Sequence, residues 1–329
     1  MTFPACSGVA YGVRGRLLIK AGSGTQTFSA ASDRYEFESE QVQKHRRFLS
    51  TQGIIGIRRR LASRVREGCY FTYGKIALYP SPGYLERLLP FMIGAKGVYP
   101  YAAAFVPGDC LSQFAMMIDR DKEVYTYSDC VCAAWELSGQ SPKWKETGNP
   151  DLMRLTLHII GGEEVKGATW PSPGPDIPET DGFVPYVFQD LDPGNTDAGD
   201  FEVDGTGRQM YDISLSVDNQ VEVKFAMSLT PSSIVSTGIK VGLSGRLPWT
   251  DANDGLYPMA YTGETAAVNF RHLLNSKHFS TRFDLHNLKV PGESPFIKDE
   301  GVVQFSIEGE SYGDTSNPEI YITNVPLGV

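Results

Sequence analysis

The sequence has no apolar run long enough to cross a membrane, and it has few cysteines. Its most apolar region, residues 88–108, is interrupted by Lys96 and by several prolines and glycines. Residues 1–16 lack a basic segment followed by an apolar core, so we expect no secretory signal peptide and a protein that is made in a cytosol. Five cysteines in 329 residues are too few and too scattered to form a disulfide framework.

Motifs that carry catalysis are also lacking. There is no nucleophile elbow, P-loop, dinucleotide fingerprint or H-E-x-x-H pair. His272, His278 and His286 follow one another at spacings of six and eight residues, which are not the close pairs that bring two imidazoles onto one metal. A hydrolase would need paired carboxylates, and nothing in the sequence singles out one pair. We therefore expect no catalytic residue, no cofactor and no enzymatic activity.

Two further segments offer possible metal ligands. Cys130 and Cys132 form a C-x-C pair within an expected strand, where both side chains share one face, and we interpret them as buried, reduced core residues. The segment 189–200 is rich in the oxygen ligands that calcium takes, namely Asp190, Asp192, Asn195, Asp197 and Asp200. It lacks the EF-hand order, so a calcium site and a plain solvated loop both stay open, and we assign no metal ligand.

What the sequence does contain is typical of a β protein with many turns. It has 34 glycines, 21 prolines and short alternating runs rich in Val, Tyr, Phe and Thr. Residues 113–137 predict a hairpin that turns near 120–122, and residues 211–229 predict a second hairpin that turns at Asp218-Asn219. The leucines of 81–94 predict a short helix, and another is expected within 251–275. The fold class that we predict is mainly β, with two tandem β-sandwich or barrel-like domains that each hold at most a short packed helix.

The predicted domain boundary lies in a proline-rich segment. Residues 168–182 contain four prolines and two glycines without apolar periodicity, which is typical of a stiffened linker. We predict an N-terminal domain at 1–167, a linker at 168–183 and a C-terminal domain at 184–329. A weak internal match supports a duplication, because residues 63–80 and 232–249 share a layout of serine, glycine, alternating strand and proline.

Charge is distributed unevenly along the chain, whose formal net charge is −9. The stretch 46–68 holds seven arginines, Arg46, Arg47, Arg58, Arg59, Arg60, Arg64 and Arg66. Residues 176–204 hold nine acidic residues and no lysine or arginine, and among them are Asp190, Asp192, Asp197, Asp200 and Asp204. The arginine stretch lacks both helical periodicity and interleaved aromatics, which disfavours direct reading of DNA or binding of a single strand. We interpret it as a basic arm that pairs with the acidic segment of a neighbouring copy; a charged edge strand that prevents aggregation is the alternative.

The order of these segments resembles a known family. The helix pattern L-x-x-L-L-P-x-x-x-G at 85–94, the hairpin at 114–130 and the late strands TLHIIGG (156–162) and QFSIEGE (304–310) are similar to the major tail tube proteins of long-tailed, siphovirus-type bacteriophages. The most telling passage is YDISLSVDNQV (211–221) followed by 228–247. The likeness is to the duplicated two-domain type of that family.

The resemblance implies a structural virion protein that assembles in the host cytoplasm into stacked rings, which form a hollow tail tube for ejection of DNA. A two-domain chain would make a homotrimer that imitates a six-fold ring. Its partners would be itself, the terminator, tape measure and distal tail proteins, and DNA in transient, non-specific passage; no membrane binding is expected. Acids lining the lumen would repel phosphate, and strand alternation nominates Glu36, Glu38, Glu40 and Glu222 for this role.

Two alternatives remain. One is another tail or baseplate component of the same fold, such as a distal tail protein or tube initiator. The other is a β-sandwich adhesin that stacks sugars on its tryptophans, Trp135, Trp144, Trp170 and Trp249.

Overall fold

The computed structural model describes residues 15–28, 33–50, 65–98, 103–108, 110–141, 151–171, 181–248, 264–290 and 304–326. Within these ranges the protein is mainly β, and a single α-helix occurs among them. A 12-stranded sheet runs along the length of the molecule, and a 7-stranded sheet covers part of it. The predicted fold class is therefore confirmed.

The elements of the N-terminal half are β1 (Arg16–Ala21), β2 (Arg34–Tyr35), β3 (Ser39–Glu40), β4 (Gln43–Ser50), β5 (Val65–Leu78), α1 (Pro82–Met92), β6 (Gly94–Val98), β7 (Ala103–Pro107), β8 (Phe114–Asp119), β9 (Val124–Gln140), β10 (Arg154–Gly161) and β11 (Glu163–Lys166). The elements of the C-terminal half are the 3-10 turns η4 (Asp181–Phe183) and η5 (Phe188–Leu191), then β12 (Asp200–Val203), β13 (Thr206–Arg208), β14 (Asp212–Asp218), β15 (Val221–Lys224), β16 (Ser233–Ser236), β17 (Lys240–Pro248), β18 (Glu264–Leu274), β19 (Lys277–Leu288), β20 (Gln304–Ser311) and β21 (Ile320–Val325).

The long sheet joins strands from both halves of the chain. Its central part has the order β5-β10-β9-β14-β17-β20, and every neighbouring pair is antiparallel. The strand β9 makes this continuity possible because its 17 residues pair with β8 and β11 near its start and with β10 and β14 farther on. The second sheet is shared in the same way, since β7 of the N-terminal half pairs with β21 near the C-terminus.

The segments that matched within the sequence occupy corresponding places in the long sheet. The matched stretches 63–80 and 232–249 contain β5 and β17, and the matched late strands are β10 and β20. The strand β10 pairs with β5 and β20 pairs with β17, with Leu155 opposite Leu78 and Phe305 opposite Leu247. The domain boundaries stay a prediction.

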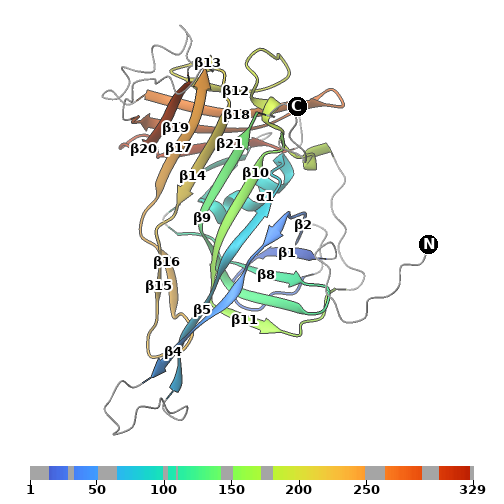
Figure 1. Cartoon of the computed structure of the whole chain (residues 1–329), viewed down its shortest axis with the longest axis vertical. Helices are drawn as coiled ribbons and strands as arrows, with labels where there is room; N and C mark the ends of the chain where they lie inside the picture. The colour runs from blue at the N-terminus through green and yellow to red at the C-terminus, as the bar shows by residue number, and fades with distance from the viewer. Residues whose placement is uncertain are drawn as a thin grey trace, which may run out of the picture.

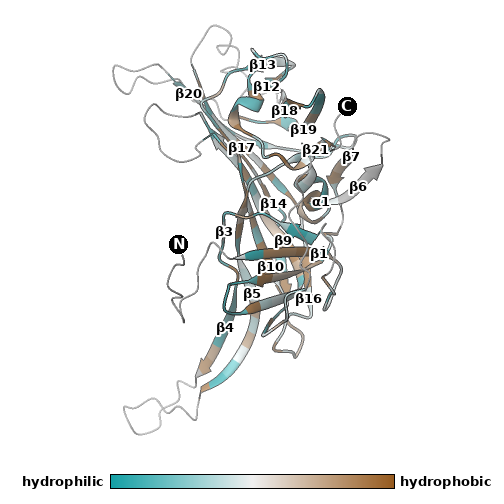
Figure 2. Ribbon diagram, turned by 90° about the vertical axis from the view of Figure 1, so that its right-hand side faces the viewer, coloured by the Kyte–Doolittle hydropathy of each residue, from teal (hydrophilic) through white to brown (hydrophobic). Residues whose placement is uncertain are grey.

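Helix α1 follows β5 and fills the space behind the long sheet. Ser81 caps it, because its Oγ accepts a hydrogen bond from the main-chain nitrogen of Tyr84 at 3.2 Å, and Pro82 starts the first turn, where no hydrogen bond is lost. Seen nearly edge-on, the long sheet has α1 and the second sheet on the same side (Figure 2). The large side chains between these layers are fully buried, including Trp135, Phe270 and Phe283.

Some predicted elements are confirmed and others are wrong. The helix near 85–94 and the β8–β9 hairpin that turns at residues 120–123 are confirmed. The hairpin predicted at Asp218-Asn219 is wrong, because β14 pairs with β9 and β17, whereas β15 pairs with β16. Asn219 is buried at this point instead of lying in an exposed turn, and Gln220 takes a positive φ of 44°, which turns the chain away from β14.

Two more predictions differ from the structure in part. Strand alternation nominated Glu36, Glu38 and Glu40, but only the short strands β2 and β3 form between residues 34 and 42. The helix expected within 251–275 is contradicted at 264–274, which is the strand β18, and 251–263 lies outside the described residues. Cys130 and Cys132 are buried and free, as expected for core residues.

Candidate functional surfaces

The outward positions of the central strands form one continuous polar face. Strand alternation buries the apolar positions of β14, β17 and β20 and leaves the intervening positions outside. Cross-strand pairing sets these outward residues side by side in two rows, one of Thr156, Glu136, Ser216, Gly242 and Glu310, the other of Arg154, Ser138, Ser214, Ser244 and Glu308. Most of these side chains are small and uncharged, so the face is smooth as well as polar.

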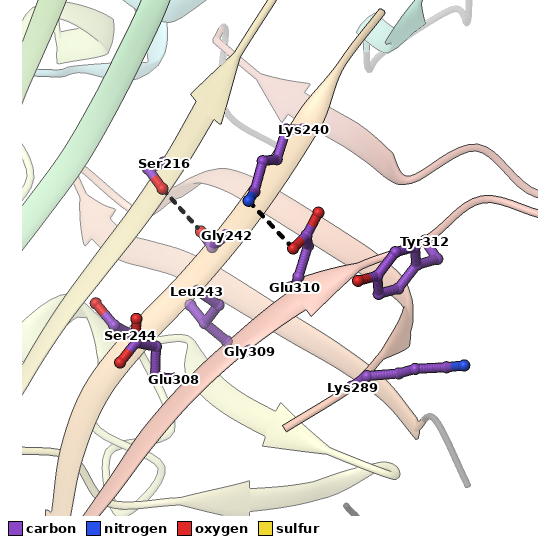
Figure 3. Close-up of a pocket in the computed structure, with 10 residues that line it drawn as sticks. All are labelled: Ser216, Lys240, Gly242, Leu243, Ser244, Lys289, Glu308, Gly309, Glu310 and Tyr312. Atoms are coloured by element: carbon purple, nitrogen blue, oxygen red, sulfur yellow. Dashed lines mark hydrogen bonds and ion pairs between the residues drawn. The ribbon is translucent and has the colours of Figure 1, made fainter. Parts of the chain in front are cut away.

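The face is hollowed along the sheet. One hollow of about 550 Å³ lies over β17 and β20, and a second of about 440 Å³ lies over β9 and β14. They adjoin at Ser244, which lines both. In the first hollow, Ser216 reaches toward Gly242, and Lys240 extends toward Glu310 (Figure 3).

Most basic side chains at this face have an acidic partner. Lys240 lies 3.3 Å from Glu310, and Arg246 is paired with Asp212. Arg154 donates to Glu38 at 2.8 Å. Each such pair lowers the tendency of its cation to bind an external phosphate, because a carboxylate already occupies the guanidinium or ammonium.

His158 adds no positive charge to the face at neutral pH. Burial lowers its pKa from 6.5, and the neighbouring Lys75 lowers it further. These two effects outweigh the opposing influence of Glu136. Besides the paired charges, the polar face carries small hydroxyl groups, the carboxylates of Glu136 and Glu308 and the ammonium of Lys289.

The four acids nominated for a lumen lie in different surroundings. Glu38 borders the polar face through its pair with Arg154, and Glu36 is exposed just before it. Glu40 is largely buried: its two carboxylate oxygens accept hydrogen bonds from Arg120 at 2.7 and 2.9 Å. Glu222 lies on β15, outside the long sheet, 3.4 Å from Lys224. Their role in a lumen stays a prediction.

Part of the basic stretch forms a hairpin that extends from one end of the molecule. The strands β4 and β5 pair and continue beyond the other strands at the lower end of Figure 1. We call residues 43–50 and 65–70 the basic hairpin. Arg46, Arg47 and Arg66 are exposed on it, and Arg46 lies 3.4 Å from Glu67. Arg58, Arg59, Arg60 and Arg64 lie outside the described residues.

The acidic segment lies at the other end of the long axis, around β12 and β13 (Figure 1). Asp192, Asp197 and Asp204 are exposed there, and Asp200 is partly buried. The Asp192 carboxylate accepts from the Gly194 nitrogen at 2.9 Å, which is an ordinary turn contact. A calcium site in this loop stays a prediction; no group of three or more potential ligands is gathered in the ranges that the structure describes.

Asp190 differs from its neighbours because it is buried. Its carboxylate accepts from the Val187 nitrogen at 2.9 Å and lies 3.9 Å from Nδ1 of His272. Burial raises the pKa of Asp190 to about 6, partly offset by the Val187 N–H, and burial lowers the pKa of His272. Asp190 is therefore a structural group rather than a surface charge, which sequence alone did not indicate.

Two of the four tryptophans can be placed. Trp135 is buried in the core against Phe283, so it offers no surface for a sugar. The guanidinium of Arg16 lies 4.3 Å from the ring of Trp170. Trp144 and Trp249 lie outside the described residues. In the described part of the chain, no helix is long and apolar enough to cross a bilayer.

The fold and its hollowed polar face define a β-rich protein built around a curved, half-barrel sheet. A model of the phage tail tube protein family matches residues 11–311, so the chain belongs to this family. Membership makes it a structural component of a phage tail, in a family that is typically not enzymatic. A comparison with curated proteins finds no match.

Proposed function

We propose that this protein assembles into rings that stack into the tail tube, and that the hollowed polar face lines the channel through which DNA is ejected. The proposal includes a homotrimeric ring of two-domain chains, a siphovirus-type tail and assembly in the host cytoplasm. Its other partners are the terminator, tape measure and distal tail proteins. The long sheet, with one polar face and two ends, is the observation that carries it.

The two ends of the long sheet support closure into a ring. In the described part of the sheet, β20 lies at one end and β3 and β4 lie beyond β5 at the other. Unpaired strand edges favour aggregation, and closing a sheet into a barrel removes them. Joining the β20 end of one copy to the β3–β4 end of the next gives every copy the same two contacts, which is the geometry of a cyclic ring.

The pairing of the two halves supports a pseudo-six-fold ring. The β5–β10 pair and the β17–β20 pair are both antiparallel and are formed by the segments that match within the sequence, and β9–β14 joins one set to the other within a single chain. If the contact between neighbouring copies resembles the β9–β14 contact within one chain, all the halves meet in a similar way. Three chains then place six similar halves around the axis of the ring. A duplicated two-domain protein accounts for this arrangement directly.

The chemistry of the polar face supports passage of DNA. Duplex DNA carries one negative charge per about 1.7 Å, and it binds proteins chiefly through lysine and arginine contacts to phosphate. On this face Lys240, Arg246 and Arg154 are paired with carboxylates. Such a wall offers hydroxyl groups and neutralised cations, so phosphate has little to bind.

The basic hairpin and the acidic segment support contact between successive rings. They lie at opposite ends of the long axis (Figure 1), so stacking copies in one direction brings one against the other. Arginine suits such an interface because its planar guanidinium pairs with a carboxylate through two hydrogen bonds. Among the acids, Asp192, Asp197 and Asp204 are exposed and available, whereas Asp190 is not.

Negative-stain electron microscopy of the purified protein, over a series of concentrations and salt, tests the proposal. Rings or hollow tubes with three-fold chain symmetry are the expected result, and tubes should shorten at high salt because exposed charge pairs are screened. Particles without a channel, or a monomer under every condition and also with a purified tail initiator, would overturn it. Chain stoichiometry by native mass spectrometry separates a trimer from other rings.

A further inference from the structure

Beside the basic hairpin lies a second, shorter hairpin that carries exposed apolar side chains. The strands β15 and β16 pair with each other and are joined by residues 225–232, which we call the apolar loop. Met227 is fully exposed, and half of the surface of Leu229 is exposed. Phe225 is exposed as well. Three large apolar side chains in one short loop are more than a soluble surface usually presents, and they indicate a contact with another molecule.

The apolar loop is held in place although its side chains are not covered. The Leu229 carbonyl accepts a hydrogen bond from the Tyr70 nitrogen of β5 at 2.8 Å, which ties the loop to the basic hairpin. Within the loop, the Thr230 nitrogen donates to Oγ of Ser228 at 3.1 Å. A loop that is already ordered loses little conformational entropy when it binds, so its apolar side chains are prepared for a partner.

An apolar groove lies at the opposite end of the molecule. It is lined by Phe188, Leu191 and Pro193 from η5 and the residues after it, by Met210 and Tyr211 between β13 and β14, and by Pro248 at the end of β17. Its volume is about 330 Å³. This is room for roughly ten waters at about 30 Å³ each, and therefore for one or two large side chains. We call it the η5 groove.

The charges around these two surfaces are complementary. The apolar loop lies next to the basic hairpin, with Arg47 and Arg66 exposed. The η5 groove includes Asp192 and continues into the acidic loop that holds Asp197. In Figure 1, β15 and β16 lie toward the end where β4 extends, whereas β12 and β13 lie at the far end. Two surfaces at opposite ends of one chain cannot meet within it, but they can meet between copies that point in the same direction.

We propose that the apolar loop of one copy inserts Met227 and Leu229 into the η5 groove of a second copy in the next ring, with the basic hairpin against the acidic loop around it. This inference rests on the proposed tube and assigns the contact that joins its rings. The contact is heterologous, with different surfaces on the two copies, so it repeats along the tube without closing on itself. Apolar burial supplies affinity at the centre, and the surrounding charges fix the direction of stacking.

Cysteine cross-linking tests the contact directly. The exposed Cys69 and Cys110 are replaced by serine, as is Cys6, which lies outside the described residues. Met227→Cys is then combined with Gln209→Cys, an exposed position beside the groove. Mild oxidation should give a ladder of cross-linked chains that extends beyond the dimer, since each copy offers both surfaces. A matched control pairs Met227→Cys with Val165→Cys on β11, which is half exposed and lies outside the groove, and it should give no ladder.

Two charge variants add a quantitative measure. Met227→Glu with Leu229→Glu should raise the protein concentration needed for tubes by at least about tenfold, because burial of each side chain is worth more than one factor of ten. Rings should persist in this variant, and Val165→Glu should leave tubes unchanged.

The outcomes separate the inference from the proposed function. Tubes that form without a cross-linked ladder, or that tolerate the double glutamate variant, overturn the inference and leave the tube intact. A protein that never forms rings overturns the proposed function, and the absence of any ladder in that sample overturns the inference with it.

Discussion

Asn219 donates its side-chain amide to the main-chain carbonyl of Met92 at 2.7 Å and to that of Cys132 at 2.9 Å. One buried side chain thereby connects three elements: the end of helix α1, the strand β9 and the turn after β14. It ties the C-terminal half to the N-terminal half at the place where β9 and β14 pair. Sequence indicated a hairpin turn at this asparagine; the structure instead uses it as a buried cross-link.

Asn219→Ala should destabilise the protein by about 2–3 kcal/mol, because it leaves two buried carbonyls without this donor. The free energy of unfolding from urea denaturation, followed by circular dichroism, measures the effect. The matched control is Gln26→Ala, which removes an exposed side-chain amide bond to the Ser23 carbonyl at 2.5 Å and should cost less than about 0.5 kcal/mol. Equal effects of the two changes would show that Asn219 does not join the halves.

Glu40→Gln should also destabilise the protein. Arg120 reaches both oxygens of Glu40 and the Val42 carbonyl, and its guanidinium lies 4.7 Å from the Tyr125 ring. The Glu40 side chain is only 14% exposed, so loss of its charge leaves a partly buried cation without its partner. We expect a loss of about 1–2 kcal/mol after allowance for the partial exposure of Arg120.

The control for this change is Glu222→Gln. Glu222 and Lys224 form a pair in which both side chains are more than half exposed, so its removal should be nearly neutral. A smaller effect at Glu40 than at Glu222 would contradict the role assigned to burial. The comparison also tests the lumen prediction, since a carboxylate engaged with Arg120 contributes little free negative charge to a channel.

The raised pKa of Asp190 predicts a specific pH dependence of the protein's stability. Burial raises its pKa from the ordinary value of 3.8 to about 6 in the folded protein, so the folded state binds more protons than the unfolded state between these pH values. The contribution of Asp190 to stability is therefore fully present below about pH 4 and is lost as the pH rises through about 6. His272 acts in the opposite direction, because its lowered pKa makes stability rise as the pH increases toward 6.5.

Asp190→Asn separates the two groups. The amide oxygen can still accept from the Val187 nitrogen, but the buried charge is gone. At pH 7 the variant should be more stable than the unchanged protein by about 2 kcal/mol, and the difference should vanish near pH 4. Urea denaturation at pH 4, 5.5 and 7 measures this, with the exposed Asp197→Asn as control. A variant that is less stable at pH 7 would contradict burial as the cause of the shift.

The sequence predicted local elements better than their partners. The helical spacing of the leucines in α1 and the alternation of β14 are properties of neighbouring residues, so they could be predicted directly. The pairing of β9 with β14 and of β7 with β21 depends on contacts between distant segments, and no local pattern specifies them. The error at Asp218-Asn219 has this origin: the turn signal is real, but tertiary contacts of β14 decide its partner.

The candidate surfaces show the same division: features of single segments could be predicted from the sequence, and features that depend on contacts between distant segments could not. The opposite charges of the two segments were visible in the sequence, and the structure adds that they lie at opposite ends of the long axis (Figure 1). The polar face was not identified, because its serines and glycines are unremarkable in sequence and become one surface only through cross-strand register. The burial of Asp190 was hidden for the same reason, since it depends on packing against His272.

Arg47→Glu combined with Arg66→Glu should weaken assembly without unfolding the chain, because both side chains are exposed on the basic hairpin. Tubes should be lost or require a higher protein concentration, while the circular dichroism spectrum and the melting temperature stay unchanged. Lys122→Glu with Lys277→Glu, two exposed positions outside the basic hairpin, is the control for the same change of net charge. Tubes that survive the double change and keep their salt dependence would contradict the role of the basic hairpin.

Ser214→Lys with Ser216→Lys should make assembled tubes retain DNA. Both serines project from β14 into the middle of the polar face. Glu136, opposite Ser216, can pair with one of the added lysines, so the second adds an ammonium that faces the channel. Each new phosphate contact should steepen the salt dependence of binding by about 0.9 in the logarithmic slope. Sedimentation of tubes with labelled short duplex DNA at several salt concentrations measures retention. Ser23→Lys with Thr25→Lys, at exposed positions after β1, adds the same charge away from the face and should not retain DNA in this way. Equal retention of DNA by the two variants would mean that the polar face does not line the channel. If it does, lysines on that face should hold DNA more strongly than lysines elsewhere on the surface.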